Sequence, residues 1–263
     1  MHDDGIPSLD ELGRDLLRVP VWRRALCLVL PFAVTALFFL FAAREWWIPA
    51  LACTMVLSFI TYGSVSHDLV HRTLGLPRWL NEPLLSAIEL LTFRSGHAYR
   101  WTHLHHHARF PSADDIEGAA AAMPWWRALL DGITLQPRLW TAAIRHRGPH
   151  RPWAIAESLL IIGMLAAAAF QPATTVYALL VIAGSWIFPF VTSYLVHDPH
   201  GADELTQTRL FRGRMLSLVA FEHLYHLEHH LFPQVPHQRW PELARRLDPF
   251  FERHGLKPVR LFW

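Results

Sequence analysis

Residues 25–65 read ALCLVLPFAVTALFFLFAAREWWIPALACTMVLSFITYGSV, two apolar runs with only the segment REW between them. The runs cover 25–43 and 47–65. As a helix, each run reaches about 28 Å, close to the thickness of the hydrocarbon core of a bilayer. A connection this short returns the chain to the side it left, so the pair predicts a transmembrane helical hairpin.

A second pair of apolar runs lies in the other half of the chain, at 154–170 and 173–196, separated only by Gln171 and Pro172. Four such runs in one small chain are more than the core of a soluble domain needs. The sequence therefore predicts an all-α integral membrane protein with four transmembrane helices arranged as two hairpins.

Composition supports this division of the chain into an apolar and a polar part. The 263 residues are 52% hydrophobic and only 17% charged, yet the mean hydropathy is a mild +0.18. We expect one domain over 1–263, with the polar part forming a helical cap on the spans. A net charge of +2 without a basic tract predicts no nucleic-acid partner.

Charge predicts on which side of the membrane the cap lies. Apart from Arg44, the 24 Lys and Arg residues all fall in the N-terminal segment, in 66–153 or in 197–263. Because such residues accumulate on the cytoplasmic side, both termini and the cap are expected there. Residues 9–19 have the apolar spacing of an amphipathic helix lying at the membrane surface.

The chain contains 18 histidines, and twelve of them fall in four clusters within the predicted cap. Histidines at i, i+3 and i+4 project from one face of a helix, where neutral imidazoles converge as a metal site requires. Eight histidines have this spacing: His67 and His71; His103, His106 and His107; His226, His229 and His230. They predict a metal centre at the cytoplasmic surface of the membrane.

Neighbouring polar residues are candidates for further ligands or for groups that orient the imidazoles. The other histidines of these clusters are His105, His200 and His223, with His197 directly after the last span. Carboxylates that accept the outer N–H of an imidazole fix its orientation. The candidates are Asp68, Asp198 and Glu228, with Asp114 and Asp115, for which ordinary loop solvation is an equal alternative.

Other metal chemistries fit this pattern less well. A zinc protease needs HExxH, whereas His67-Asp-Leu-Val-His71 has aspartate in place of the glutamate base. A haem between the spans needs histidines inside the apolar runs, which hold none. A metal transporter needs polar groups at mid-bilayer, and Glu157 lies at the end of its run.

The chain contains the motifs HxxxH, HxxHH and HxxHH in this order, and the third lies within HLEHHLFP at residues 226–233. This pattern resembles that of the membrane fatty-acid desaturase superfamily. The resemblance implies a non-haem di-iron site in the cap, dioxygen as co-substrate and a membrane lipid as substrate. It implies nine iron ligands: His67, His71, His103, His106, His107, His197, His226, His229 and His230. The position of His197 matches the additional histidine of desaturases, and His223 is its competitor.

The resemblance leaves the reaction open. Removing two hydrogens from a fatty-acyl chain is the preferred interpretation. The stretch FPSADDIEG at residues 110–118 is also similar to bacterial carotenoid hydroxylases and ketolases, which act on an isoprenoid ring. A non-enzymatic metal-binding membrane protein is a remote third. Without an HPGG haem motif or a GxGxxG fingerprint, electrons are expected from a separate donor of ferredoxin or cytochrome b5 type and its reductase. No substrate-binding residue is assigned.

Overall fold

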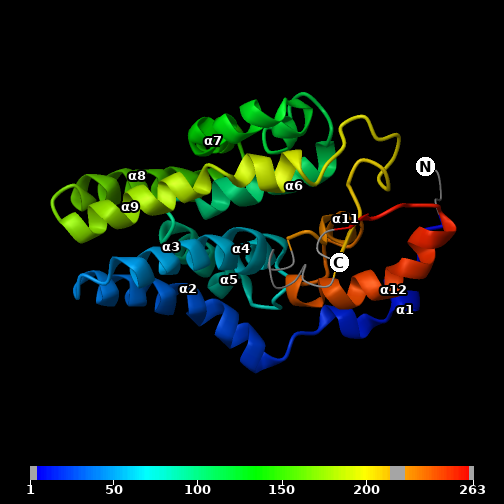
Figure 1. Cartoon of the computed structure of the whole chain (residues 1–263), viewed down its shortest axis with the longest axis horizontal. Coiled ribbons are helices and arrows are strands. Elements are labelled where there is room, and N and C mark those ends of the chain that lie inside the picture. The colour runs from blue at the N-terminus through cyan, green and yellow to red at the C-terminus, as the bar shows by residue number, and fades with distance from the viewer. Residues whose placement is uncertain (1–4, 214–222, 261–263) are drawn as a thin grey trace.

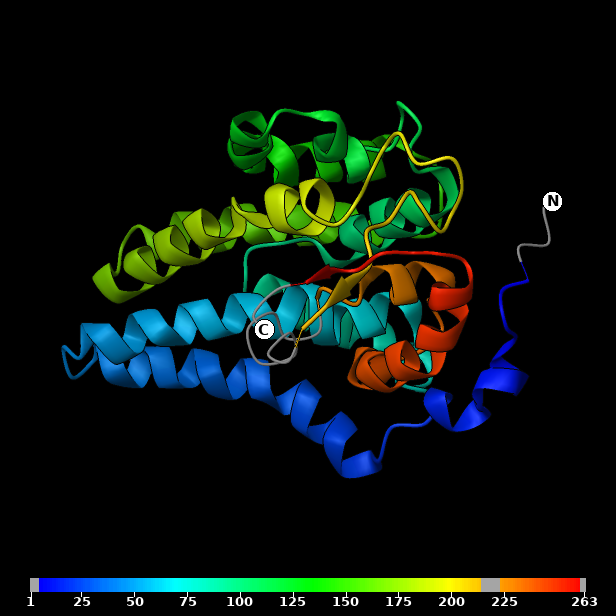
Figure 2. The ribbon, with the colours of Figure 1, turned by 45° about the vertical axis from the view of Figure 1, so that its right-hand side comes forward.

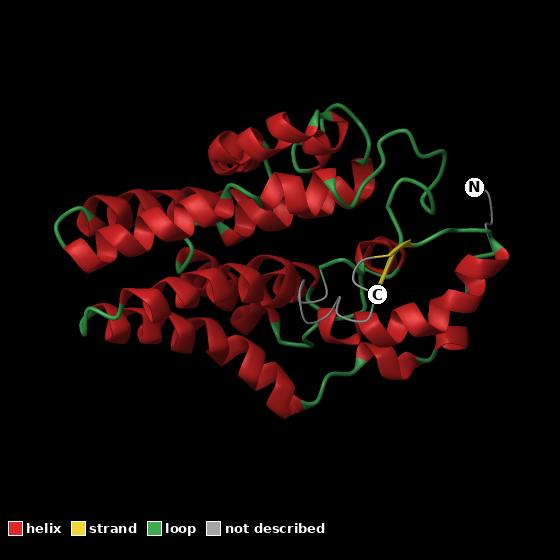
Figure 3. Ribbon diagram, viewed as in Figure 1, coloured by secondary structure: helices red, strands yellow, loops and turns green. Residues whose placement is uncertain are grey.

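The computed structural model describes residues 5–213 and 223–260, and these are mostly helical, as the sequence predicts. Two long helical hairpins extend side by side, and shorter helices gather at one end of them (Figures 1 and 3). Parts of the predicted cap and both chain ends lie outside the described residues, at 1–4, 214–222 and 261–263.

The first hairpin consists of α2 (Val21–Ala42) and α3 (Trp47–Ile60). The helical backbone that begins with α3 extends beyond residue 65, where the predicted apolar run ends. It continues through a π-helical segment, η2 (Thr61–Val65), into α4 (Ser66–His71). A single helical rod therefore leads from the apolar region to the first pair of histidines.

The second hairpin consists of α8 (Arg151–Ala168) and α9 (Pro172–Ser185). After α9 the chain enters another π-helical segment, η4 (Pro189–Tyr194). The four predicted runs thus coincide with four helical segments that are long and apolar enough to cross a membrane.

The helices of the hairpins carry apolar side chains on their outer faces as well as between them. Phe38, Leu57 and Ile161 are fully buried between the helices, while Leu159 and Leu179 are among many large apolar side chains left exposed. Helices that are apolar all round bury their outer face in another apolar medium, which here is the lipid.

The remaining elements form the cap around the ends of η2 and η4 (Figure 2). Its helices are α5 (Arg78–Leu90), α6 (Gly96–Arg109), α7 (Trp125–Arg145), α11 (His226–Leu231) and α12 (Trp240–Arg253), with the short turns η3 (Gly118–Ala122) and η5 (His237–Arg239). Two-residue strands, β1 (Phe211–Arg212) and β2 (Val259–Arg260), pair in parallel.

The prediction of one amphipathic helix over 9–19 is wrong. The segment forms two separate turns, α1 (Leu9–Leu12) and η1 (Arg14–Leu17), because Gly13 between them has a φ of +104°. The apolar side chains of both turns, Leu12 and Leu16, are buried in a cluster with residues of α12. The N-terminal segment therefore packs on the cap through Leu12 and Leu16, while Leu17 stays exposed.

The carboxylate of Glu157 joins α8 to the start of α6. It is buried and accepts hydrogen bonds from the hydroxyl of Ser95 (2.6 Å), the backbone N–H of His97 (3.1 Å) and the ring of His97 (2.7 Å). Ser95 itself caps α6 through the N–H of Ala98. Because α6 carries three of the predicted ligands, this contact fixes their helix against the second hairpin.

Candidate metal centre

All nine predicted ligands meet in two groups within the cap. The first group contains five imidazoles: His67 and His71 of α4, His103 and His107 of α6, and His229 of α11. The second contains four: His106 of α6, His197 after η4, and His226 and His230 of α11. Within each group the ligating atoms lie within 4.8 Å of one another. The i, i+3, i+4 triplets on α6 and α11 are each shared between the groups, so these two helices face both.

The Nε2 atoms of each group converge. In the second group, the Nε2 of His197 lies 3.2 Å from that of His106, 3.2 Å from that of His230 and 3.1 Å from that of His226. Ring nitrogens that bind one ion at about 2.1 Å and at right angles lie about 3 Å apart. The observed separations are those of nitrogens directed at a common ion.

The first group shows the same spacing with His229 at its centre. The Nε2 of His229 lies 2.9 Å from that of His67 and 2.7 Å from that of His107. His107 is in turn 3.2 Å from His103, measured between the two Nε2 atoms. The ring of His71 packs against all four other rings, with centroids 4.6 to 5.0 Å away.

Hydrogen bonds at the outer nitrogens show that lone pairs, and not N–H groups, point into the second group. The Nδ1–H of His106 donates to Asp115 Oδ2 (2.7 Å), and that of His197 donates to the carbonyl of Ser193 (3.1 Å). A neutral imidazole has a single N–H, so the Nε2 atoms of both rings carry lone pairs. Facing lone pairs repel one another unless a cation lies between them. The residues therefore fit a metal ion.

Burial keeps these imidazoles neutral. It lowers the pKa of His197, His226, His229 and His230 well below the ordinary value, and repulsion between neighbouring imidazoles lowers each pKa further. For His103, burial followed by the proximity of His106 lowers the pKa to about 3. Neutral imidazole is the form that binds a metal, so the site is ready for an ion at physiological pH.

Two acidic residues in the loop after α6 orient the ligands. Asp115 accepts the Nδ1–H of His106, as described, and Glu117 Oε1 accepts the Nδ1–H of His103 (2.8 Å). Both carboxylates are buried. Asp115 was one of the candidates from sequence, whereas Glu117 was missed. It lies in the same stretch as Asp115, but nothing local to that stretch distinguishes it from a solvated loop carboxylate.

The carboxylates of Asp68 and Glu228, which were expected to accept the outer N–H of an imidazole ligand, bind other groups. Asp68 accepts the backbone N–H (2.9 Å) and the Nδ1–H (2.7 Å) of His237, and Glu228 pairs with Arg212 (2.7 Å). A residue next to a ligand on a helix points about 100° away from it, so Asp68 and Glu228 face the surrounding elements. They fasten η5 to α4 and β1 to α11.

The predicted role of Asp198 also differs from its contact. Its Oδ1 accepts the backbone N–H of His200 (3.0 Å), which shapes an exposed turn. His105 points away from both groups, stacks on Trp101 and lies 3.3 Å from Asp114. His200 is exposed in the same turn as Asp198.

His223, the competitor of His197, lies outside both groups of the described residues. Its ring packs directly over Gly63, where a Cβ atom would come within 2.5 Å of it. Burial lowers the pKa of His223 to about 4. His237, which belongs to none of the four histidine clusters of the sequence, is buried and paired with Asp68.

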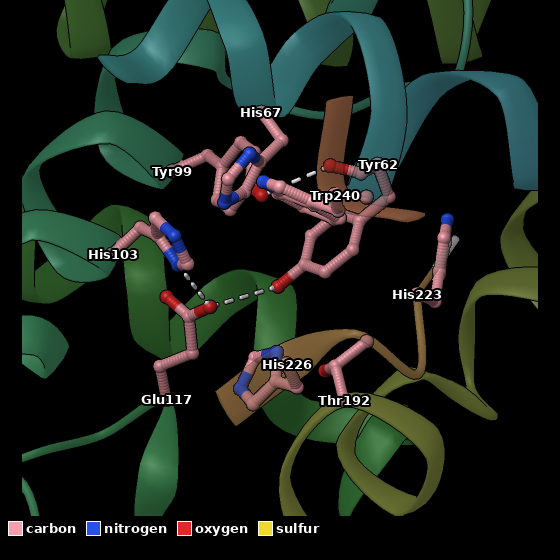
Figure 4. Close-up of a pocket in the computed structure, with 10 residues that line it drawn as sticks. Tyr62, His67, Tyr99, His103, Glu117, Thr192, His223, His226 and Trp240 are labelled. Atoms are coloured by element: carbon pink, nitrogen blue, oxygen red, sulfur yellow. Dashed lines mark hydrogen bonds and ion pairs between the residues drawn. The ribbon is translucent and has the colours of Figure 1, made fainter. Parts of the chain in front are cut away.

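A narrow cavity of about 30 Å³ lies between the histidine groups and the hairpins (Figure 4). His67, His103 and His226 border it on the side of the groups, while Gly63 of η2 and Thr192 of η4 border it on the side of the hairpins. The remaining lining residues are Tyr62, Tyr99, Glu117, His223 and Trp240. The cavity therefore connects the candidate metal centre with the ends of two apolar helices.

Both apolar helices that reach this cavity do so through a π-helical segment. η2 directly precedes the helix that carries His67, and η4 ends three residues before His197. A π-helical turn holds more residues than an α-helical turn and rotates everything that follows it. Each segment therefore changes the direction in which the next histidine points.

Buried clusters of neutral imidazoles at the end of four apolar helices define a class of protein, membrane proteins with a histidine-rich site that can hold metal ions. Within this class, the sequence matches the family model described as fatty acid desaturase over residues 44–261. The chain belongs to the fatty acid desaturase family, as its histidine pattern predicts, and this makes it an integral membrane oxidoreductase. No match was found among curated proteins.

Proposed function

We propose that this protein is a membrane-bound, dioxygen-dependent, non-haem di-iron enzyme that desaturates a fatty-acyl chain. The observation that carries the proposal is the division of nine imidazoles into two groups with converging Nε2 atoms. Two groups correspond to two ions, and family membership supports iron as the metal.

The roles of the residues follow from their positions. The five imidazoles of the first group would hold one iron ion and the four of the second group the other. Bound iron would supply the reduction of dioxygen and the oxidation of an unactivated C–H bond, while the protein positions the substrate and excludes water. Asp115 and Glu117 keep the Nδ1–H of His106 and His103 directed outward, so that the Nε2 lone pairs stay directed at the ions.

The substrate is a membrane lipid whose reacting carbon reaches the cavity of Figure 4 from the side of the hairpins. Apolar and aromatic groups of Tyr62, Tyr99 and Trp240 line this space. Such a lining suits a hydrocarbon chain and keeps water away from the reacting carbon.

Electrons come from a separate donor of ferredoxin or cytochrome b5 type with its reductase. The distribution of basic residues along the chain supports a cytoplasmic position for the termini and for the metal centre, where such a donor is available.

Oxygenation of a carotenoid ring, by hydroxylation or ketolation, is the second candidate. The observation that favours it is the position of the FPSADDIEG stretch, residues 110–118. This stretch resembles that of carotenoid hydroxylases and ketolases, and it supplies both carboxylates that contact the imidazoles, Asp115 and Glu117.

Mass spectrometry of total lipid from a host that makes the protein together with a ferredoxin and its reductase tests the proposal. The host is grown with and without a carotenoid pathway, and His229→Ala is the inactive control. Acyl chains lighter by two hydrogens, seen only with the intact protein, are expected. A carotenoid that gains oxygen while the acyl chains stay unchanged would transfer the assignment to the second candidate.

A further inference from the structure

Helix α7 lies on the outside of the molecule, in contact with α6, α8 and η4 (Figures 1 and 2). One stripe of the helix faces these neighbours: Ala128, Gly132, Leu135, Leu139 and Ala143 are all buried. Their spacing of three and four residues is that of one helix face. Among the described residues, no element covers the side chains on the rest of the helix surface that are exposed.

This outer surface is divided into two flanks. Trp126, Leu130 and Ile133 form an apolar flank and are 52, 57 and 50% exposed. At about 100° per residue, the exposed Thr134 and Thr141 lie on the adjacent flank. An ion pair between Asp131 and Arg138 lies on that same flank. A helix surrounded only by water has no reason to separate its exposed residues in this way.

Gly132 fixes the level of the apolar flank along the hairpins. The backbones of α7 and of the chain after α9 touch there, since a Cβ at Gly132 would come within 1.8 Å of the carbonyl oxygen of Trp186. Helix α9 has 14 residues and is therefore about 21 Å long. Trp186, which follows it, lies within the ~30 Å hydrocarbon core if the tip of the hairpin is at the opposite surface.

Exposed apolar side chains also occur on the second hairpin where α7 meets it. Trp186 and Ile187, directly beside the Gly132 contact, are 39 and 47% exposed. Three exposed arginines mark the passage from α7 to α8: Arg145 ends α7, Arg147 lies in the loop and Arg151 begins α8. Apolar groups at hydrocarbon level, followed by arginines, match the acyl chains and then the headgroups of a leaflet.

We propose that α7 is partly embedded in the membrane. Its apolar flank lies among the acyl chains of the leaflet nearest the histidine groups, and its polar flank faces water. The helix is thus a fifth membrane-contacting element, too polar on one flank to be recognised as a span. Because α7 also packs against η4, it brings the lipid next to the wall of the cavity that contains Thr192. This inference does not depend on the catalytic activity.

Site-directed spin labelling in nanodiscs of phosphatidylcholine and phosphatidylglycerol tests the inference. The free cysteines Cys27 and Cys53 are first replaced by serine. Labels are then placed one at a time on the apolar flank (Leu130→Cys, Ile133→Cys) and on the polar flank (Thr134→Cys, Thr141→Cys). We expect the ratio of oxygen accessibility to nickel-chelate accessibility to be several-fold higher on the apolar flank.

Equal ratios on the two flanks would overturn the inference, because both flanks would then face water. Dipolar broadening between labels at Ile133→Cys would also overturn it, because a second copy of the chain would then cover the flank. A matched pair without labels provides an independent readout. Ile133→Asp should lower the melting temperature of the nanodisc-bound protein, while Thr134→Asp, one residue away, should leave it unchanged.

Discussion

The two imidazole groups differ in how their outer nitrogens are held. In the second group, Asp115 and the carbonyl of Ser193 accept the Nδ1–H of two of the four rings. In the first group, only the ring of His103 has such a partner among the described residues, and the buried Nδ1 atoms of His67 and His229 have no hydrogen-bond partner there. A larger share of the rings is therefore held in place before an ion arrives in the second group than in the first.

This difference has a chemical consequence. Rings whose outer nitrogen is hydrogen-bonded keep one tautomer and one orientation, which raises the affinity for the metal. A group with fewer such bonds and more ligands tolerates changes in the number of rings that bind. We therefore expect the second group to depend on each outer hydrogen bond more than the first group does.

The largest expected effect comes from removing a ligand. His106→Ala removes one of four rings of the second group and should abolish lipid oxidation. The neighbouring His105→Ala is a matched control on the same helix, since His105 contacts Trp101 and Asp114 instead of the groups. Its activity should be retained, with stability changed by no more than about 0.5 kcal/mol. Full activity of His106→Ala, measured by lipid mass spectrometry, would show that this ring is not a ligand.

A smaller effect is expected at the outer hydrogen bonds. Asp115→Asn should lower iron affinity by about 10–100-fold, the usual cost of losing a group that orients a ligand. Glu117→Gln should lower iron affinity by a smaller factor, because the four other rings of its group do not depend on Glu117. Asp114→Asn, at the exposed neighbour of Asp115, is the control. Iron titration of the three purified variants gives their order of iron affinity. A larger loss of affinity in Glu117→Gln than in Asp115→Asn would contradict the expected difference between the two imidazole groups.

The last prediction concerns stability instead of activity or iron binding, at a buried histidine outside the groups. Burial lowers the pKa of His237, but the charge and hydrogen bond of Asp68 outweigh it and raise the pKa to about 10. His237 is therefore a cation in the folded protein, unlike the neutral ligands. A raised pKa stabilises the fold fully below pH 6.5, and this contribution is lost as the pH rises through about 10.

Thermal unfolding of His237→Asn as a function of pH measures this contribution. Below pH 6.5 the variant should be less stable by about 3 kcal/mol, the typical cost of breaking a buried ion pair. The difference from the natural protein should shrink between pH 6.5 and 10. A difference that is constant over this range would show that His237 is not charged.

The sequence predicted which histidines come together because their spacing depends on local helical geometry. Helical spacing alone placed His103, His106 and His107 on one side of α6, and the apolar runs marked the four long helices. Helical spacing could not predict that the histidine triplets of α6 and α11 are each divided between two imidazole groups. This division depends on how α6 and α11 face each other across the cap, which is a tertiary property.

The partners of the acidic residues were also beyond local reasoning. Asp68 and His237 are far apart in the chain, and nothing in either segment announces their contact. Glu117 was missed because its role depends on how the loop after α6 folds back onto the helix. The single predicted helix over 9–19 failed because Gly13 adopts a positive φ that breaks the helical periodicity.

Counting bound iron tests the central claim most directly. The full-length protein in nanodiscs is titrated anaerobically with iron(II), unbound metal is removed, and iron per chain is determined. Two imidazole groups predict two iron ions per chain. One ion, or none, would contradict the assignment of a separate iron ion to each group.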